Sequence, residues 1–227
     1  MCTSSFQTQS NNFAGTPAFA YRGQFDAFVA KINIAPEATT TQLVSSVNPS
    51  VFGKSVTFAA TVSSSGGTPT GTVTFRNGTT VLGTRTLSGG VASFTTSKLP
   101  AGSNNITAAY GSDPNFSSST SAPVVQLVLI ATTTALTSAP NPSVVGQTVT
   151  FTATVNSSFG APPDGETVTF KKGTTVLGTR SVNGGVASFA TSTLRVGTTA
   201  VKAVYGGDST FAGSTSNTVK QVVTAAN

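Results

Sequence analysis

Apolar and polar side chains alternate with a period of two in many short segments of this 227-residue chain. In the segment 56–62, valine, phenylalanine and alanine occupy every second position, and Val73 and Phe75 alternate with threonines in the same way. The segment 106–110 repeats the pattern. Because successive side chains of a strand point to opposite faces, each segment predicts a strand with one buried and one solvated face. The chain is therefore predicted to be all-β.

Turn signals separate these segments. The Asn-Gly pair at 77–78 predicts a tight hairpin turn in which both residues have positive φ, and the glycine pair at 89–90 predicts the next turn. Pro49 and Pro142 have no amide hydrogen to donate to a neighbouring strand. They therefore predict an edge strand that kinks early and changes sheet.

The pattern of strands and turns occurs twice. The triplet Asn-Pro-Ser at 48–50 returns at 141–143, and Thr-Thr-Val-Leu-Gly-Thr-Arg at 79–85 returns at 174–180. The second copy is longer in the loop around 160–164, which predicts a surface loop there. A repeat of about 93 residues with some seven short strands has the size of an immunoglobulin-type sandwich.

These observations divide the chain into three parts. Residues 37–129 and 130–227 are predicted to be two tandem immunoglobulin-like β-sandwiches, each with its own core. Residues 1–36 are predicted to hold a short N-terminal β-strand or a partly disordered remnant. No glycine- and serine-rich linker separates the copies, so we expect a stiff, elongated rod.

Composition excludes several function classes. Charged residues make up only 8% of the chain, and the net charge of +6 comes from basic residues scattered along the sequence. Without a basic cluster or interleaved aromatic residues, we expect no nucleic-acid partner. We also expect no membrane insertion, because no apolar stretch approaches the ~20 residues of a membrane span.

Reactive side chains are scarce. The chain has no histidine and its single cysteine is Cys2, so a Ser-His-Asp arrangement, most zinc sites and an intrachain disulfide are excluded. Asp164 and Glu166 are close in sequence, but we interpret them as part of a solvated loop rather than as an acid–base pair. We expect no enzymatic activity, no catalytic residue, no cofactor and no metal centre.

Two residue pairs recur in both copies and deserve separate interpretations. Asp113 and Asp208 each follow a Tyr-Gly pair. They are weak calcium candidates, and the favoured alternative is an Asx-type turn, because a calcium site needs 6–8 oxygen ligands. Tyr110 and Tyr205 are predicted to be core rings whose hydroxyls fix the adjacent corner of the sandwich.

The repeated motifs resemble the bacterial Ig-like repeat of group 3, and the resemblance covers about residues 38–225. Its features are Asn-Pro-Ser before Gly-x-x-Val-Thr-Phe, then Thr-Val-Thr-Phe, then Gly-Gly-Val-Ala-Ser-Phe, and finally Ala-x-Tyr-Gly-x-Asp-x-x-Phe-x-x-Ser. The last motif ends at Ser119 in copy 1 and at Ser214 in copy 2. Antibody-type domains carry a cysteine pair and a core tryptophan, which this chain lacks.

A second resemblance concerns the N-terminal part. The run Asp-Ala-Phe-Val-Ala-Lys at 26–31 resembles the end of a bacterial seven-bladed β-propeller-type repeat, which implies a truncated blade. A single blade cannot bury both faces of its sheet. The alternative is an ordinary leader strand of the first sandwich.

The resemblance to bacterial Ig-like repeats implies a non-catalytic, extracellular spacer of a bacterial surface or secreted protein, with a signal peptide expected upstream. The partners would be neighbouring domains of a larger polypeptide, and we expect a monomer. The alternative is an adhesion module that binds carbohydrate or protein through the end loops 66–70 and 158–164.

Overall fold

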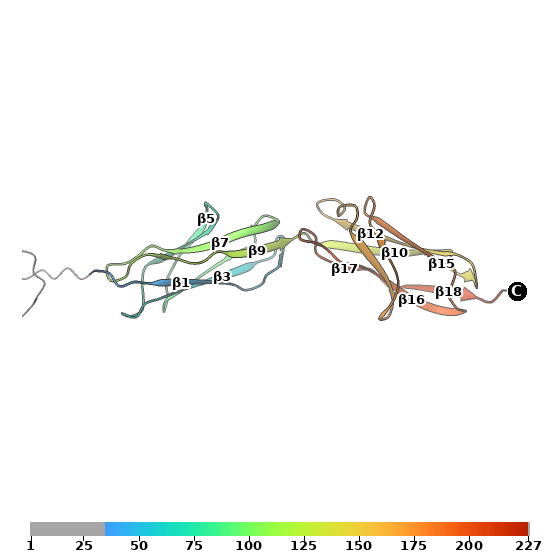
Figure 1. Cartoon of the computed structure of the whole chain (residues 1–227), viewed down its shortest axis with the longest axis horizontal. Helices are drawn as coiled ribbons and strands as arrows, with labels where there is room; N and C mark the ends of the chain where they lie inside the picture. The colour runs from blue at the N-terminus through green and yellow to red at the C-terminus, as the bar shows by residue number, and fades with distance from the viewer. Residues whose placement is uncertain (1–34, 227) are drawn as a thin grey trace, which may run out of the picture. The chain divides into compact units, whose positions relative to one another are not determined.

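The computed structural model describes residues 35–226, and every regular element among them is a β-strand. The strands β1 to β9 form sandwich 1, and β10 to β18 form sandwich 2 (Figure 1). This confirms the prediction of an all-β chain with two tandem sandwiches. Sandwich 1 contains β1 (Thr40–Ser45), β2 (Ser50–Val51), β3 (Val56–Ser63), β4 (Thr72–Asn77), β5 (Thr80–Thr86), β6 (Val91–Thr96), β7 (Gly102–Tyr110), β8 (Ser119–Thr120) and β9 (Val124–Leu129).

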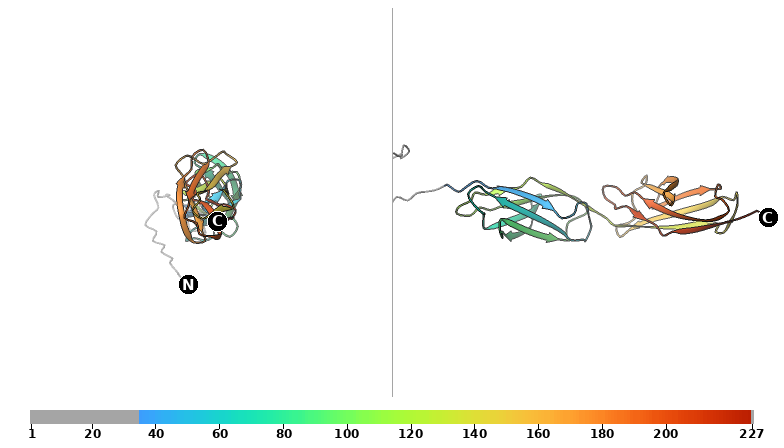
Figure 2. Two further views of the ribbon diagram at one scale, coloured as in Figure 1. Left: turned by 90° about the vertical axis from the view of Figure 1, so that its right-hand side faces the viewer. Right: turned by 90° about the horizontal axis from the view of Figure 1, so that it is seen from below.

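Sandwich 1 has a smaller and a larger sheet. The smaller sheet has the order β1-β3-β6, and the larger has the order β2-β9-β7-β4-β5, with β8 added beside β7. The strands of the smaller sheet are antiparallel, whereas β2 runs parallel to β9. The two sheets face each other as layers (Figures 1 and 2).

Sandwich 2 repeats this topology. Its smaller sheet has the order β10-β12-β15, and its larger sheet has the order β11-β18-β16-β13-β14, with β17 beside β16. The strands are β10 (Thr132–Ala139), β11 (Ser143–Val144), β12 (Val149–Ser157), β13 (Thr167–Lys172), β14 (Thr175–Ser181), β15 (Val186–Thr191), β16 (Gly197–Tyr205), β17 (Ser214–Thr215) and β18 (Val219–Thr224).

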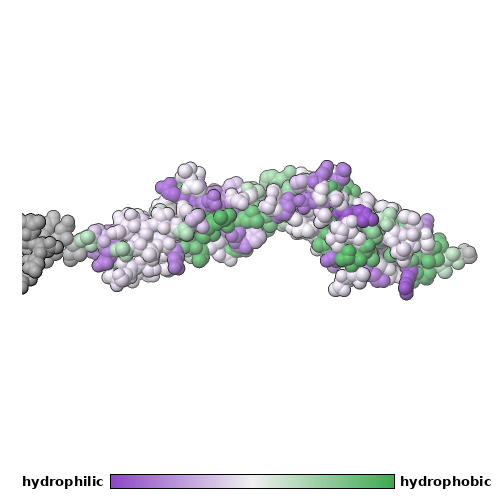
Figure 3. Space-filling model, in the orientation of Figure 1, coloured by the Kyte–Doolittle hydropathy of each residue, from purple (hydrophilic) through white to green (hydrophobic). Residues whose placement is uncertain are grey.

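Each sandwich has its own hydrophobic core, built by the alternating residues. Along β3, Val56, Phe58 and Val62 are buried, while the threonines between them face outward. The equivalent side chains of β12 are also buried, and the two cores form separate clusters. On the face shown in Figure 3, hydrophobic and hydrophilic residues are interspersed over both sandwiches.

The first strand changes sheet as predicted. In sandwich 1, β1 pairs with β3 in the smaller sheet, and after Pro49 the chain continues as β2 in the larger sheet. Sandwich 2 makes the same change at Pro142, between β10 and β11. The chain enters each sandwich where this first strand begins and leaves it at the opposite end (Figure 1).

One turn differs from its prediction. Asn77 is the last residue of β4 and pairs with Thr80, so the hairpin turns through Gly78 and Thr79. Of these two, only Gly78 has positive φ, at 55°. The prediction of positive φ at Asn77 was therefore wrong, because the strand extends one residue further and glycine at the first turn position supplies the positive φ alone. The turn at 89–90 does have two glycines with positive φ.

Predictions for the N-terminal part fall mostly outside the described residues. The propeller-like run at 26–31 and Cys2 precede residue 35, where the description begins. Among the described residues, Glu37 forms a bridge to Phe116 and so belongs with sandwich 1. No helix in the described range is long and apolar enough to cross a membrane.

Candidate functional site

The most elaborate polar structure is a seam between the first and last strands of each sandwich. In sandwich 1 the Nδ2 of Asn48 donates to the carbonyl of Val125 (2.7 Å), and its Oδ1 accepts from the amide of Leu127 (2.9 Å). Beyond β2, the amide of Phe52 donates to the carbonyl of Leu129 (2.8 Å). The Asn48 side chain thus extends the parallel β2–β9 ladder at the end where backbone pairing has not yet begun. We call residues 45–52 with 125–129 the polar seam of sandwich 1.

Gln126 lies at the centre of this seam and is fully buried. Its Oε1 accepts from the hydroxyl of Ser45, and its Nε2 donates to the hydroxyl of Ser50 (3.2 Å) and to the carbonyl of Leu127 (3.0 Å). Since Ser45 is on β1 and Ser50 is on β2, one side chain joins both parts of the first strand to β9. All polar groups of the amide have partners, as a buried amide requires.

Sandwich 2 has an equivalent seam. The side chain of Asn141 donates to the carbonyl of Lys220 (2.9 Å) and accepts from the amide of Val222 (3.0 Å). The buried Gln221 accepts from Ser138 (2.7 Å) and donates to Ser143 (3.3 Å). Two copies with different surrounding residues therefore build the same network, which identifies it as a feature of the repeat.

Hydroxyl groups fix the opposite end of the first strand. Thr39 donates to Ser119 (2.7 Å), and a hydroxyl bond of the same length joins Thr41 to Ser119. In sandwich 2, Thr132 and Ser214 form the corresponding bond (2.8 Å). These contacts explain why a Thr-rich run opens each copy and why a serine ends the last repeated motif. The first strand is thus attached to β8 or β17 at its start and to β9 or β18 at its end.

Asp113 closes a turn rather than presenting free ligand oxygens. Its Oδ1 accepts from the amides of Asn115 (2.8 Å) and Phe116 (2.9 Å), and its Oδ2 accepts from the amide (3.0 Å) and the hydroxyl (2.6 Å) of Thr70. The Thr70 hydroxyl, together with these amides, lowers the pKa of Asp113 to about 2. The four donors already surround the carboxylate, which is the arrangement of an Asx-type turn.

Asp208 occupies the same turn in sandwich 2. Its Oδ1 accepts from the amide of Thr210 (2.6 Å) and from the amide of Phe211. No group of three His, Cys, Asp or Glu side chains that could hold a metal occurs among residues 35–226. Calcium binding by Asp113 or Asp208 remains a prediction that the hydrogen bonding of these turns does not favour.

Tyr110 and Tyr205 are buried core rings, each about 1% exposed. Neither hydroxyl has a hydrogen-bond partner within normal distance in the described part of the chain, and the predicted role of the two rings at the corner of each sandwich stays a prediction. Burial, with the negative charge of Asp208 and then of Glu166, raises the pKa of Tyr205 to about 12. Burial, followed by the charge of Asp113, also raises the pKa of Tyr110. Both phenols are therefore neutral packing groups.

The two carboxylate residues of the longer loop in copy 2 have different hydrogen-bonding surroundings. The Oδ1 of Asp164 accepts from the amide of Gly184 (2.7 Å), which ties the loop to the neighbouring glycine turn. The Glu166 backbone carbonyl accepts from the amide of Val182 (2.6 Å). Asp164 is exposed and Glu166 is partly exposed, as expected for a solvated loop.

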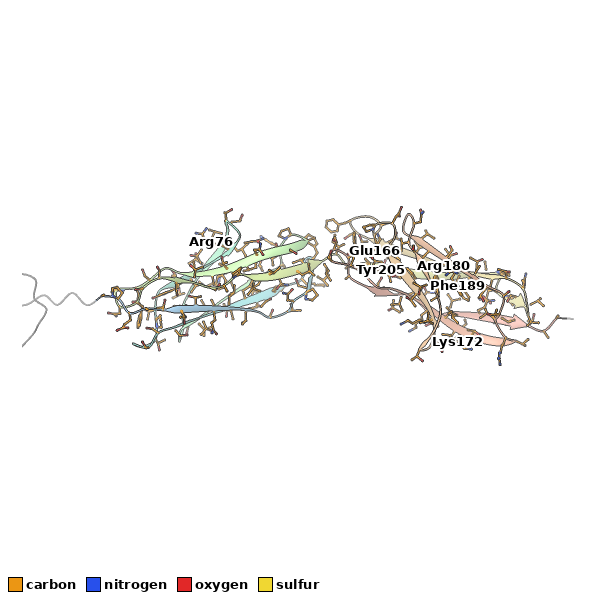
Figure 4. All side chains as sticks on the ribbon, in the orientation of Figure 1. Arg76, Glu166, Lys172, Arg180, Phe189 and Tyr205 are labelled. Carbon is orange, nitrogen blue, oxygen red and sulfur yellow. The ribbon has the colours of Figure 1, made fainter. Side chains whose placement is uncertain are left out.

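A clamp of arginine, phenylalanine and glycine closes one side of each sandwich. In sandwich 2, the Arg180 guanidinium lies 5.2 Å from the ring centroid of Phe189, and Figure 4 shows the two side chains together. A Cβ on Gly178 would lie 2.5 Å from the same ring, so any other residue there would force the ring to shift. Sandwich 1 repeats the clamp, with the Arg85 guanidinium 5.1 Å from the ring centroid of Phe94. The arrangement stabilises the edge between the sheets by a cation–π contact.

Sequence reasoning missed the central residue of the seam and the partners of the clamp. Gln126 stands among valines and leucines, and nothing local shows that its amide is buried. A usable signal was the recurrence of glutamine at 126 and 221, together with that of Asn-Pro-Ser at 48–50 and 141–143. The exact repetition of 79–85 similarly marked the strand that carries the clamp.

Several solved structures resemble the chain. The fibronectin(III)-like modules of Clostridium thermocellum CbhA share 25% identity over 82% of this chain and 94% of theirs, with a TM-score of 0.44. Domains of a 1.5-MDa bacterial ice-binding adhesin share 14% identity over 85% of this chain and 67% of theirs, with a TM-score of 0.33. No curated protein matches the chain.

A family model gives the decisive comparison, because it matches the chain twice, over residues 43–128 and 136–224. The two matched segments correspond to the two sandwiches and include the asparagine and glutamine of each polar seam. The chain therefore belongs to the family of the bacterial Ig-like domain (group 3).

Proposed function

We propose that the chain is an extracellular, non-catalytic spacer that transmits tension between neighbouring domains of a larger bacterial surface or secreted protein. One observation carries the proposal. In each sandwich the first and last strands are held side by side in parallel by a polar seam, while the chain enters and leaves at opposite ends (Figure 1).

The direction of the strands decides how such a seam responds to force. Pulling on the two ends of sandwich 1 draws β2 and β9 in opposite directions along their common axis. The bonds between them are then loaded together rather than one after another. The side-chain bonds of Asn48 and Gln126 add to the short backbone ladder, so more bonds must break in one step.

The join between the sandwiches also suits a spacer. β9 ends at Leu129 and β10 begins at Thr132. Between them, Ile130 is buried in the core of sandwich 2, donates its amide to Thr210 (2.7 Å) and accepts from Ala212 (2.8 Å). The connecting residues are therefore part of a folded domain, which leaves little free linker to extend under load.

Single-molecule force spectroscopy on the full chain tests the proposal. Asn48→Ala should lower the rupture force of sandwich 1 and leave that of sandwich 2 unchanged, and Asn141→Ala should do the reverse. Asn105→Ala, at an exposed position of β7 outside the seam, is the matched control. Unchanged rupture forces in both seam variants would contradict a tension-bearing role.

A further inference from the structure

Three lysines form a row across the outer face of the larger sheet of sandwich 2. Lys171 on β13 lies directly opposite Lys202 on β16. Lys220 on β18 pairs with Ala200, which is two residues before Lys202 on the same strand. The lysines are far apart in sequence, but the strand register brings them to neighbouring positions on three adjacent strands.

All three side chains face away from the core. Phe170, Ala203 and Gln221, the chain neighbours of the three lysines, are buried, so the alternation of each strand turns the lysines outward. Lys202 and Lys220 are exposed and Lys171 is partly exposed. Two strand spacings of about 4.8 Å, with an offset of two residues of about 3.3 Å each between Lys202 and Lys220, make the row span about 12 Å diagonally.

The row has no acidic counterpart on its own strands. Like charges directly opposite each other in a sheet are destabilising. The acidic residues of sandwich 2 are Asp164 and Glu166, which precede β13, and Asp208, which follows β16. At about 3.3 Å per residue, Glu166 is about 16 Å from Lys171 along the strand. The face is therefore an uncompensated strip of positive charge.

The fold does not require this charge. The same places in the larger sheet of sandwich 1 hold Arg76 and Thr107, which are paired with each other, and Val125. Sandwich 1 keeps the same strands and register with one positive charge where sandwich 2 has three. The lysine row thus distinguishes the second copy, although both copies share the polar seam and the clamp.

We infer that the row of Lys171, Lys202 and Lys220 binds an acidic polysaccharide of the uronate type through its carboxylates. A polyuronate carries one carboxylate on each sugar ring, and a row of ammonium groups on a flat sheet can meet several of them together. The outward neighbours Thr169 and Thr198 can hydrogen-bond sugar hydroxyls. The other outward neighbours include the exposed side chains of Val176, opposite Lys171, and Val222. None of these neighbours is aromatic, which disfavours single-stranded nucleic acid, because its binding relies on base stacking.

Titration calorimetry of the full chain with alginate, a polyuronate, tests the inference, with neutral dextran as the control ligand. Alginate should bind at low ionic strength and lose its affinity as salt is raised, and dextran should not bind. The double variant Lys202→Thr with Lys220→Thr removes two exposed ion pairs with the ligand and should weaken alginate binding about tenfold. The matched variant Lys54→Thr with Lys98→Thr removes the same charge from sandwich 1 and should bind like the parent chain.

Three results would overturn the inference. These are no alginate binding at low salt, equal weakening in both double variants, and tighter binding to a single-stranded oligonucleotide than to alginate. Thermal unfolding of each variant shows whether sandwich 2 remains folded. The binding test is independent of the spacer role, because an unchanged rupture force in the seam variants leaves the polysaccharide result unaffected.

Discussion

The polar seam and the outer face of the larger sheet are subject to different physical constraints. Asn48, Gln126 and their partners are repeated almost atom for atom by Asn141 and Gln221. The outer face differs, since Val125 in copy 1 corresponds to Lys220 in copy 2. A buried amide must keep all its partners, whereas an exposed strand position accepts almost any residue that suits a sheet. Similarity between the copies therefore marks what holds the fold together, and difference marks where the copies can acquire separate roles.

The largest expected effect is at the seam. Gln126→Ala removes a buried amide, leaves the hydroxyls of Ser45 and Ser50 without that partner and opens a cavity. We expect the free energy of unfolding of sandwich 1 to fall by about 3 kcal/mol. Denaturant unfolding measures the change. Gln42→Ala, on the exposed side of β1, is the control and should change the free energy of unfolding by no more than about 0.5 kcal/mol. An equal loss in both variants would contradict the conclusion that the polar seam stabilises sandwich 1.

The clamp gives the next largest effect. Gly178→Ala places a Cβ against the Phe189 ring, which is also stacked on Phe170 with centroids 5.5 Å apart. We expect a loss of about 1–3 kcal/mol, because the crowded ring has little room to shift. Gly206→Ala, which meets no atom within 4 Å, is the control in thermal unfolding. Equal melting temperatures of the two variants would contradict the close packing of Gly178 against the Phe189 ring.

A pH effect is expected at the Asp113 turn. The pKa of Asp113 is about 2, below its ordinary value of 3.8, so its ionised form stabilises the fold above pH 3.8. This stabilisation is lost as the pH falls towards 2. Thr70→Val removes the hydroxyl donor and should raise the pKa of Asp113, as measured by NMR titration of its carboxyl. An unchanged pKa would show that the amides alone hold the carboxylate.

The smallest effect is expected on the outer face. Lys202→Thr installs the residue of copy 1 and relieves the repulsion with Lys171. The stability of sandwich 2 should change by no more than about 0.5 kcal/mol, in the stabilising direction at low salt. Chemical unfolding at low and high ionic strength checks this. A loss above about 1 kcal/mol in the free energy of unfolding would mean that Lys202 stabilises the fold. That result would contradict the interpretation that the outer face, unlike the polar seam, is not needed for stability.

The sequence alone determined the all-β class, the two copies, the buried faces of the strands and the change of sheet at Pro49 and Pro142. These features are local, because alternation with a period of two and the missing amide hydrogen of proline act within a few residues. The hairpin at Asn77 shows that even a local prediction can fail. The residue at which a strand ends depends on its pairing with the neighbouring strand.

Only the tertiary structure decided that the side chain of Gln126 is buried and joins the first strand to β9. It also decided that three lysines far apart in sequence share one surface. The partners of Gln126 include Ser45 and Ser50, more than seventy residues earlier, and no short window of sequence contains them. The lysine row likewise depends on the register of β13, β16 and β18. Register is fixed by the packing of whole sheets, so the chemistry of a sheet surface emerges only when the strands are aligned.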